Sequence, residues 1–307
     1  MESSMEEKFE PCGVLVIDKP QGMTSHDVVG KVRRLYHTRK VGHTGTLDPM
    51  ATGVLVILIG RAAKAAEYLT VHNKSYCANM RLGMTTDTED VTGQILTTSA
   101  DIPAPDRVKE AASSFAGEIL QVPPMYSALK VNGQKLVDLA RRGIEIERKA
   151  RPVTVHSISC TPLESGDYAL EVTCSAGTYI RTLCADIGKA LGCGGVMAAL
   201  RRTHTGEFSL EEAVTPEDLE AMSDEQRLAL LRPVESLFAD LPAVSLPAFY
   251  EKLCRNGCEI YQKKIGVDHK IGTRVRLCDA NGKFFALGEV REFENGTALR
   301  AIKHFDI

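Results

Sequence analysis

The stretch from Gly42 to Leu55, which reads GHTGTLDPMATGVL, constrains the fold of this chain more than any other. It places one carboxylate, Asp48, among small and hydroxyl-bearing residues and directly before Pro49. Proline fixes its own φ angle and pushes the preceding residue towards extended backbone, while glycines allow tight paths. An unbroken apolar run, 54–59, follows. The pattern predicts a stiff loop that presents one acid at the edge of a buried strand, although an Asp-Pro pair near glycines is also an ordinary turn signal.

The remaining apolar pattern switches between strand and helix periods. Alternating or continuous apolar residues predict strands at 13–17, 54–59, 76–82, 153–160 and 168–174. Apolar residues at three- and four-residue spacing predict helices at 25–35, 61–69, 105–115, 134–142, 181–191 and 218–231. Because hairpin-like strand pairs interleave with helices, we predict an α+β fold, with a mixed, mainly antiparallel sheet flanked by helices.

The length of 307 residues fits one large domain and one small one. We predict a disordered tail over residues 1–12, a main domain over 13–240 and a second domain over 241–307. A basic insertion, 123–152, interrupts the main domain. Short strands separated by turns, at 274–278, 284–290 and 298–302, predict that the second domain is a small β-rich module, and a generic β-barrel would satisfy this pattern.

Charge is segregated along the chain although the net charge is only −3. The segment 121–156 carries seven lysines or arginines against three acids, whereas 207–240 carries ten acids against two arginines. A further basic cluster lies within 31–40. This segregation is expected if one face of the protein meets phosphates and another faces solvent, although independent solvated faces would give the same pattern.

Composition excludes several classes of protein. No apolar run approaches the roughly 18 residues of a membrane helix, and the acidic N-terminus is not a signal peptide, so we expect no membrane partner. The nine cysteines are scattered, and the pair Cys254 and Cys258 has no second pair or histidine cluster to complete a zinc site. We therefore expect free thiols in a cytoplasmic protein and no metal.

Further motifs accompany the Asp48 loop in a fixed order. They are GVLVIDKPQGMTSH at 13–26, KSY at 74–76, GTYIR at 177–181 and LRRT at 200–203. This set resembles the tRNA pseudouridine-55 synthase (TruB) family, from about residue 13 to about residue 208. The last segment of the chain is loosely similar to a PUA-type RNA-binding domain.

The resemblance implies a pseudouridine synthase fold followed by a PUA-like domain, and an enzyme that isomerises uridine 55 in the TΨC loop of tRNA. Pseudouridine formation breaks the N1–C1′ bond and joins C5 to C1′, so no atom enters or leaves and no cofactor is required. A base in an RNA loop must be flipped out before it can react. The implied partner is the T-arm of tRNA, with no protein partner required, and we expect a monomer.

The resemblance makes Asp48 the catalytic residue. A carboxylate can attack covalently at the ribose or at the base, stabilise positive character at C1′ or remove a sugar proton, and the sequence leaves these routes open. A nearby cation favours the charged carboxylate, and the resemblance pairs Arg181 with Asp48. The resemblance also implies that Asp90, in the segment TDTEDVTG, extends this ion pair, although the segment is also a plain turn signal.

Four residues are implied to bind the substrate. Tyr76 resembles the aromatic residue that stacks beneath the flipped base, although a strand tyrosine can equally be a core residue. Tyr179 resembles a residue whose hydroxyl contacts the acid and the base, and Leu200 resembles one that lines the uracil site. His43 is implied to splay the RNA loop and stack in the vacated space, although a lone loop histidine is usually structural.

The implied RNA phosphate contacts are cations. Lys19 and Lys64 could be phosphate contacts or pocket supports, whereas Lys130, Arg141 and Arg142 lie on the insertion, which in the resembled family is a mobile lobe that closes on RNA. Of Arg201 and Arg202, we expect only one to face inward. Two rival functions remain at this point: a relative that works inside a guide-RNA particle, and an RNA-folding chaperone.

Overall fold

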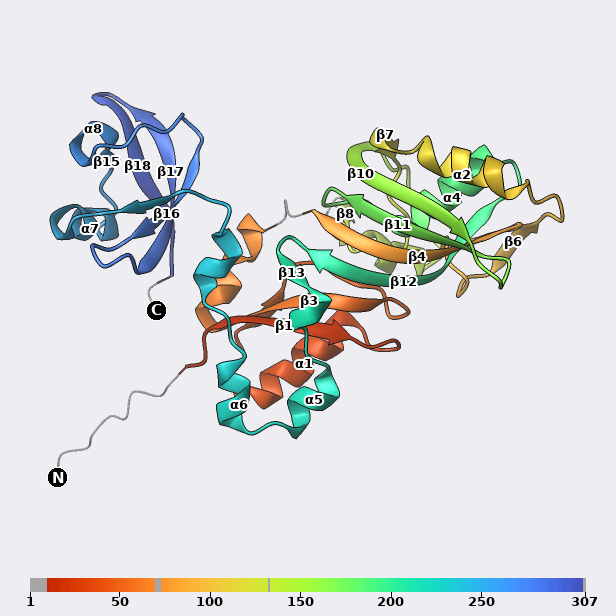
Figure 1. The fold of residues 1–307 in the computed structure, drawn as a ribbon, viewed down its shortest axis with the longest axis horizontal. Helices are drawn as coiled ribbons and strands as arrows, with labels where there is room; N and C mark the ends of the chain where they lie inside the picture. The colour runs from red at the N-terminus through yellow and green to blue at the C-terminus, as the bar shows by residue number, and fades with distance from the viewer. Residues whose placement is uncertain (1–9, 70–72, 132, 306–307) are drawn as a thin grey trace.

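The computed structural model describes residues 10–69, 73–131 and 133–305 (Figure 1). Its strands are β1 (Gly13–Lys19), β2 (Val41–His43), β3 (Thr52–Ile59), β4 (Lys74–Leu82), β5 (Met84–Thr86), β6 (Ile95–Thr98), β7 (Gly117–Gln121), β8 (Lys130–Val131), β9 (Gln134–Lys135), β10 (Arg151–Pro162), β11 (Tyr168–Cys174), β12 (Gly195–Thr205), β13 (Phe208–Ser209), β14 (Ala243–Ser245), β15 (Ile260–Tyr261), β16 (Arg274–Cys278), β17 (Phe284–Phe293) and β18 (Gly296–His304). Its α-helices are α1 (Ser25–Leu35), α2 (Pro105–Ser113), α3 (Leu136–Ala140), α4 (Ile180–Ala190), α5 (Pro216–Ala221), α6 (Asp224–Ala229), α7 (Ala248–Arg255) and α8 (Gln262–Ile265), and its 3₁₀ helices are η1 (Gly60–Tyr68), η2 (Leu210–Glu212) and η3 (Val234–Phe238).

A nine-stranded sheet forms the centre of the molecule. Its main path runs β1-β3-β12-β4-β11-β10-β7, with β13 added to β12 and β2 added to β3. Every neighbouring pair in it is antiparallel except β3 and β12, which run parallel. Helices α1, α2 and α4 pack on one face of this sheet (Figure 1). The predicted α+β fold with a mixed, mainly antiparallel sheet is therefore confirmed.

Strand β3 is buried on both faces, and this explains the unbroken apolar run that follows the Asp48 loop. Leu55, Ile57 and Ile59 pack into the core beneath α1, while Val54, Val56 and Leu58 pack into a second core on the opposite face. A strand covered on both sides needs no polar alternation, so its sequence is continuously apolar.

The second core joins the central sheet to the C-terminal residues. A separate five-stranded sheet, ordered β14-β16-β17-β18-β15, packs against η3 through the rings of Phe238, Phe284 and Phe305. All three rings belong to the same cluster as the outer face of β3. The predicted β-rich module is confirmed, and Figure 1 shows it set apart from the central sheet, with η1 and η3 between them.

Three predicted helices differ from the observed ones. The helix predicted over 218–231 is two short helices, α5 and α6, because Ser223 forms a capping box with Gln226 and starts a new helix. The helix predicted over 134–142 is shortened to α3, because Gln134 and Lys135 pair with β8 as a small hairpin. The alanine-rich helix predicted over 61–69 is the 3₁₀ helix η1.

Most of the predicted disordered tail, 1–12, lies outside the described residues. Its last residues do not follow the prediction: Pro11 is buried, and Glu10 forms an ion pair of 2.7 Å with Lys40. Among the described residues, no helix is both long enough and apolar enough to cross a membrane.

The parallel β3–β12 junction depends on a glycine. Gly53 pairs with Arg202, has φ +104°, and a Cβ built there would lie 2.1 Å from the Arg202 carbonyl oxygen. We expect Gly53→Ala to lower the free energy of unfolding by about 3 kcal/mol or more, because backbone strain and a clash with main chain add. Chemical denaturation measures the loss.

Gly166→Ala is the matched control. Gly166 has φ +87°, and nothing lies within 4 Å of the position that a Cβ would occupy, so its substitution isolates the conformational cost, which is about 1 kcal/mol. Equal losses in the two variants would contradict the role assigned to the close approach of β12.

Candidate active site

The Asp48 loop is held from beneath by a buried arginine. Arg202 of β12 is 2% exposed and donates to the carbonyl oxygens of Gly45 (3.0 Å) and Val54 (2.8 Å), with a longer contact of 3.5 Å to Thr46. Its neighbour Arg201 points away, with its side chain 43% exposed and paired with Asp18. One of the two adjacent arginines therefore faces inward, as alternation along a strand predicts.

Two further side chains fix the same loop. The Ser25 hydroxyl accepts from the Leu47 amide (2.8 Å) and lies 3.1 Å from the Leu47 carbonyl oxygen. The Lys19 ammonium donates to the carbonyl oxygens of Pro20 and Met23, and at 3.4 Å to that of Pro49. The loop is rigid because its otherwise unpaired carbonyl groups have donors from three separate elements.

The placement of Lys19 corrects its predicted role as an RNA phosphate contact. The residue is fully buried, and burial lowers the pKa of its ammonium to about 8. A buried ammonium that already donates to backbone carbonyls cannot reach a phosphate on the surface. Of the two roles predicted for this lysine, support of the pocket is the one that agrees with its position.

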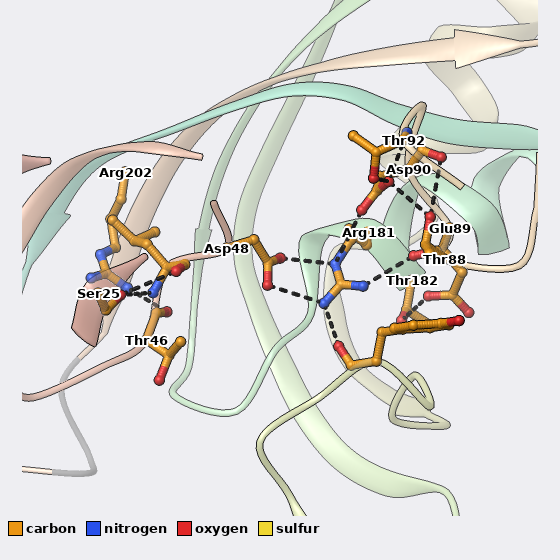
Figure 2. A network of polar contacts seen from close by, with 12 residues as sticks. Ser25, Thr46, Asp48, Thr88, Glu89, Asp90, Thr92, Arg181, Thr182 and Arg202 are labelled. Carbon is orange, nitrogen blue, oxygen red and sulfur yellow. Dashed lines mark hydrogen bonds and ion pairs between the residues drawn. The ribbon is translucent and has the colours of Figure 1, made fainter. Parts of the chain in front are cut away.

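Asp48 points towards the buried guanidinium of Arg181 (Figure 2). Arg181 Nε lies 2.9 Å from Asp48 Oδ2, and Arg181 Nη2 donates to Asp48 Oδ1 at 3.3 Å. The Arg181 side chain is 6% exposed and that of Asp48 is 35% exposed. The two-pronged contact fixes the plane of the carboxylate while leaving part of it open to a ligand.

Arg181 contacts two other segments as well, the turn at Thr88 to Asp90 and the insertion at Tyr126. Its Nη1 donates to the Thr88 carbonyl oxygen at 3.0 Å, its Nη2 donates to the Tyr126 carbonyl oxygen at 2.7 Å, and its Nε lies 4.0 Å from Asp90 Oδ2. Figure 2 shows the guanidinium at the centre of these contacts. The structure thus brings Asp48, Arg181 and Asp90 together.

The turn that carries Asp90 is more constrained than an ordinary turn. Asp90 is buried, and its Oδ1 accepts hydrogen bonds from the hydroxyl of Thr88 and from both the amide and the hydroxyl of Thr92. Glu89 between them has φ +63°, and its carboxylate accepts from the Thr182 hydroxyl on α4 at 2.5 Å. A non-glycine residue in this conformation marks a backbone path that the surroundings impose.

Asp48 opens into a cavity of about 270 Å³ that also contains three predicted substrate-binding residues. Tyr76 on β4 is 8% exposed and Leu200 on β12 is 9% exposed. Tyr179 lies at the start of α4, where the side-chain amide of Gln121 accepts from its backbone N–H and donates to its carbonyl. The cavity therefore combines one acid with two tyrosines and an apolar wall.

Burial and the Arg181 cation shift the pKa of Asp48 in opposite directions. Burial raises the pKa of Asp48 above its ordinary value, the Arg181 cation lowers it, and the negative charge of Asp90 raises it. The net direction is upward, so the prediction that a nearby cation favours the charged form describes only one of the contributions. Burial and then Arg202 lower the pKa of Lys74, which also lines the cavity, to about 8.

Other predicted residues lie outside this cavity lining. His43 is on β2 and pairs with Ile57; its Nδ1 is buried without a hydrogen-bond partner among the described residues, and burial lowers its pKa. Lys64 is exposed on η1. Lys130, Arg141 and Arg142 are exposed on the insertion, around a small core formed by Met125, Leu136 and Leu139.

Several residues of the site are absent from the sequence-based prediction. Lys74 and Ser127 line the cavity, and Gln121 clamps Tyr179. Lys74 stands in the KSY motif, which is a signal that could have identified it. Ser127 lies in the insertion and Gln121 just before it, and no motif in the sequence marks either residue.

All nine cysteines are free, and the described residues contain no group of three or more histidine, cysteine or acidic side chains arranged to hold a metal ion.

Two family models match the chain. The one described as TruB family pseudouridylate synthase (N terminal domain) matches residues 33–180, and the one described as tRNA pseudouridylate synthase B C-terminal domain matches residues 181–239. The tRNA pseudouridine synthase B of Clostridium kluyveri is 44% identical over 282 residues, which cover 92% of this chain and 96% of that protein. The enzyme of the same name from Aromatoleum aromaticum is 48% identical over 245 residues, which cover 80% of each.

Solved structures show the same fold. A chain from a crystal structure of a Cbf5–Nop10–Gar1 complex has a TM-score of 0.74 at 28% identity and covers 99% of this chain and 91% of that one. A chain from an archaeal box H/ACA sRNP Nop10–Cbf5 complex has a TM-score of 0.70 at 26% identity, covering 99% and 89%. The fold, the site and these similarities define a pseudouridine synthase. Within that class, the chain belongs to the TruB family.

The electrostatic account of Asp48 predicts shifts of opposite sign in two variants. Arg181→Gln removes the cation that lowers the pKa of Asp48, so this pKa should rise further. Asp90→Asn removes a negative charge that raises it, so the pKa should fall. Titration of the Asp48 carboxyl carbon by ¹³C NMR measures both, and shifts in the same direction would disprove the account.

Proposed function

We propose that this chain isomerises uridine 55 in the TΨC loop of tRNA to pseudouridine, with Asp48 as the catalytic residue. The observation that carries the proposal is the ion-paired Asp48 carboxylate, partly open to a small cavity that Tyr76, Tyr179 and Leu200 also line. Membership of the TruB family and the extensive identity to proteins named tRNA pseudouridine synthase B support the substrate.

The reaction needs a negative group beside the ribose and base and no added cofactor. Attack on the substrate, stabilisation of charge at C1′ and removal of a sugar proton all use the ionised carboxylate. Arg181 opposes the effect of burial on the pKa of Asp48 and so keeps more of the acid ionised. The cavity confines the detached uracil while it turns, which prevents its loss to solvent.

The uridine must leave the RNA stack to reach Asp48, which costs a few kcal/mol. Tyr76 supplies an aromatic face on which the flipped base stacks, Leu200 supplies the apolar wall, and the Tyr179 hydroxyl contacts the base and the acid. His43, outside the cavity lining, stacks in the space that the base vacates. These contacts offset the cost of flipping.

The basic lobe, residues 123–152, grips the RNA backbone. Its cations Lys130, Arg141 and Arg142 are exposed, and Lys64 is an exposed cation on η1. Residues 13–240 form the catalytic domain and residues 241–307 a PUA-like domain that adds RNA contacts. The lobe also reaches the catalytic pair, because the Tyr126 carbonyl oxygen accepts from Arg181.

We expect the chain to act as a cytoplasmic monomer without a guide RNA or a protein partner. Identity to proteins named tRNA pseudouridine synthase B is 44–48% for the relatives above, against 28% and 26% for the chains from Cbf5 complexes. The purified chain should therefore convert uridine 55 in a tRNA transcript by itself. Conversion only after a guide RNA is added would exclude this assignment.

Asp48→Asn should abolish isomerisation and leave RNA affinity within about threefold of wild type, because the amide keeps the shape of the side chain but cannot act as a carboxylate. Mapping of pseudouridine in a tRNA transcript measures the first effect, and filter binding measures the second. A normal rate of isomerisation in this variant would disprove the catalytic role.

Neutralising the lobe should weaken binding and reduce its salt dependence. For the triple variant Lys130→Gln, Arg141→Gln and Arg142→Gln, the slope of log affinity against log salt should become shallower by about one for each phosphate that the protein no longer neutralises. Arg107→Gln, at an exposed position on α2, is the matched control and should leave the slope unchanged. An unchanged slope in the triple variant would exclude the lobe as a phosphate grip.

A further inference from the structure

Ser127 carries a buried hydroxyl without a hydrogen-bond partner. The residue is 6% exposed, and its Oγ has no partner among the described residues. Its backbone is fully engaged: its amide donates to Met125 and its carbonyl accepts from Val137. A polar group in this state is costly, because it has lost water without gaining a protein partner, and it therefore calls for an explanation.

The residue lines the same cavity as Asp48, at the end that holds the ion pair. Arg181 Nη2 joins the two sides there, since it donates both to Asp48 and to the carbonyl oxygen of Tyr126, the residue directly before Ser127. Tyr76 and Leu200 belong instead to the paired strands β4 and β12. Ser127 thus follows a backbone group that shares the Arg181 guanidinium with Asp48, and it is not part of the sheet against which a base would stack.

The position of Ser127 near the ion pair indicates which part of the substrate it would contact. If Asp48 acts on a nucleoside around C1′, the atoms nearest to the ion-pair end of the cavity belong to the ribose. In a nucleotide inside an RNA chain, the 3′ and 5′ oxygens are phosphate esters, so the 2′-hydroxyl is the one free hydroxyl of the sugar. A serine hydroxyl can both donate to it and accept from it.

We propose that Ser127 Oγ forms a hydrogen bond with the 2′-hydroxyl of the flipped uridine and makes the site prefer RNA over DNA. The inference rests on the proposed function and names the group that distinguishes its substrate class. The free protein holds the hydroxyl desolvated, and the substrate supplies its partner. A 2′-deoxyuridine in the same position leaves the Ser127 hydroxyl without a partner. The cost of a buried, unpaired polar group therefore disfavours the ligand that lacks the 2′-hydroxyl.

A cycle of protein and substrate changes tests the contact. Wild type and Ser127→Ala are each assayed on two T-arm hairpins that differ only in uridine or 2′-deoxyuridine at the target position. We expect Ser127→Ala to reduce kcat/KM on the uridine hairpin by about fivefold to tenfold, the usual size for one hydrogen bond, and to have little effect on the deoxyuridine hairpin. The preference for ribose should therefore fall by the same factor.

The affinities for the two hairpins are also measured, with Asp48→Asn introduced both into the wild type and into Ser127→Ala. Binding to these inactive proteins does not depend on turnover, so slow reaction of the deoxyuridine hairpin does not limit the result. The ribose preference is the ratio of the values for the uridine and deoxyuridine hairpins. If this ratio is the same with and without the Ser127 hydroxyl, both in kcat/KM and in affinity, the proposal is overturned. Failure of the wild type to modify the uridine hairpin would instead refute the proposed function, which separates the two hypotheses.

Thermal stability distinguishes a substrate contact from a structural one. Because the hydroxyl has no partner among the described residues of the free protein, Ser127→Ala should melt at or above the wild-type temperature. Ser25→Ala is the matched control: that hydroxyl bonds the Leu47 backbone, so its loss should lower the melting temperature. A clear fall in melting temperature for Ser127→Ala would show a structural role and count against the proposal.

Discussion

The guanidinium of Arg181 is the interaction on which the site depends. It joins four segments that are distant in the sequence: the Asp48 loop, the turn at Thr88 to Asp90, the basic lobe at Tyr126 and its own helix, α4. Removing one charge from a buried pair leaves the other uncompensated, which is strongly unfavourable. The contacts of Arg181 that hold these segments together therefore also influence the pKa of Asp48. The ionisation of the acid depends on the folded arrangement of all four segments.

Inward-facing cations serve a different purpose from outward-facing ones. Lys19 and Arg202 donate to backbone carbonyls of the irregular segments around Asp48, because a buried loop must find donors for its own polar groups. Lys130, Arg141 and Arg142 are exposed, where phosphates can reach them. The net charge does not distinguish buried cations from exposed ones, because both count equally in the sum. Only the exposed cations contribute strongly to the electrostatic potential outside the protein.

The basic lobe lies next to the ion pair of Asp48. Its backbone at Tyr126 accepts a hydrogen bond from Arg181, and its next residue, Ser127, lines the cavity. A lobe that moves on contact with RNA would change the surroundings of the acid at the same time.

The sequence alone determined the Asp48 loop, the class of sheet and five strands of the central sheet, β1, β3, β4, β10 and β11, because proline, glycine and apolar periodicity act over a few residues. It also marked Arg181 through a motif. It did not predict β12, which carries Leu200 and Arg202. Only the tertiary structure decided which polar side chains are buried. It shows that Lys19 is buried, and that Ser127 lines the cavity while its buried hydroxyl has no partner among the described residues. The burial of Lys19 and of the Ser127 hydroxyl depends on contacts with strands and loops far away in the chain, which no local pattern of residues encodes.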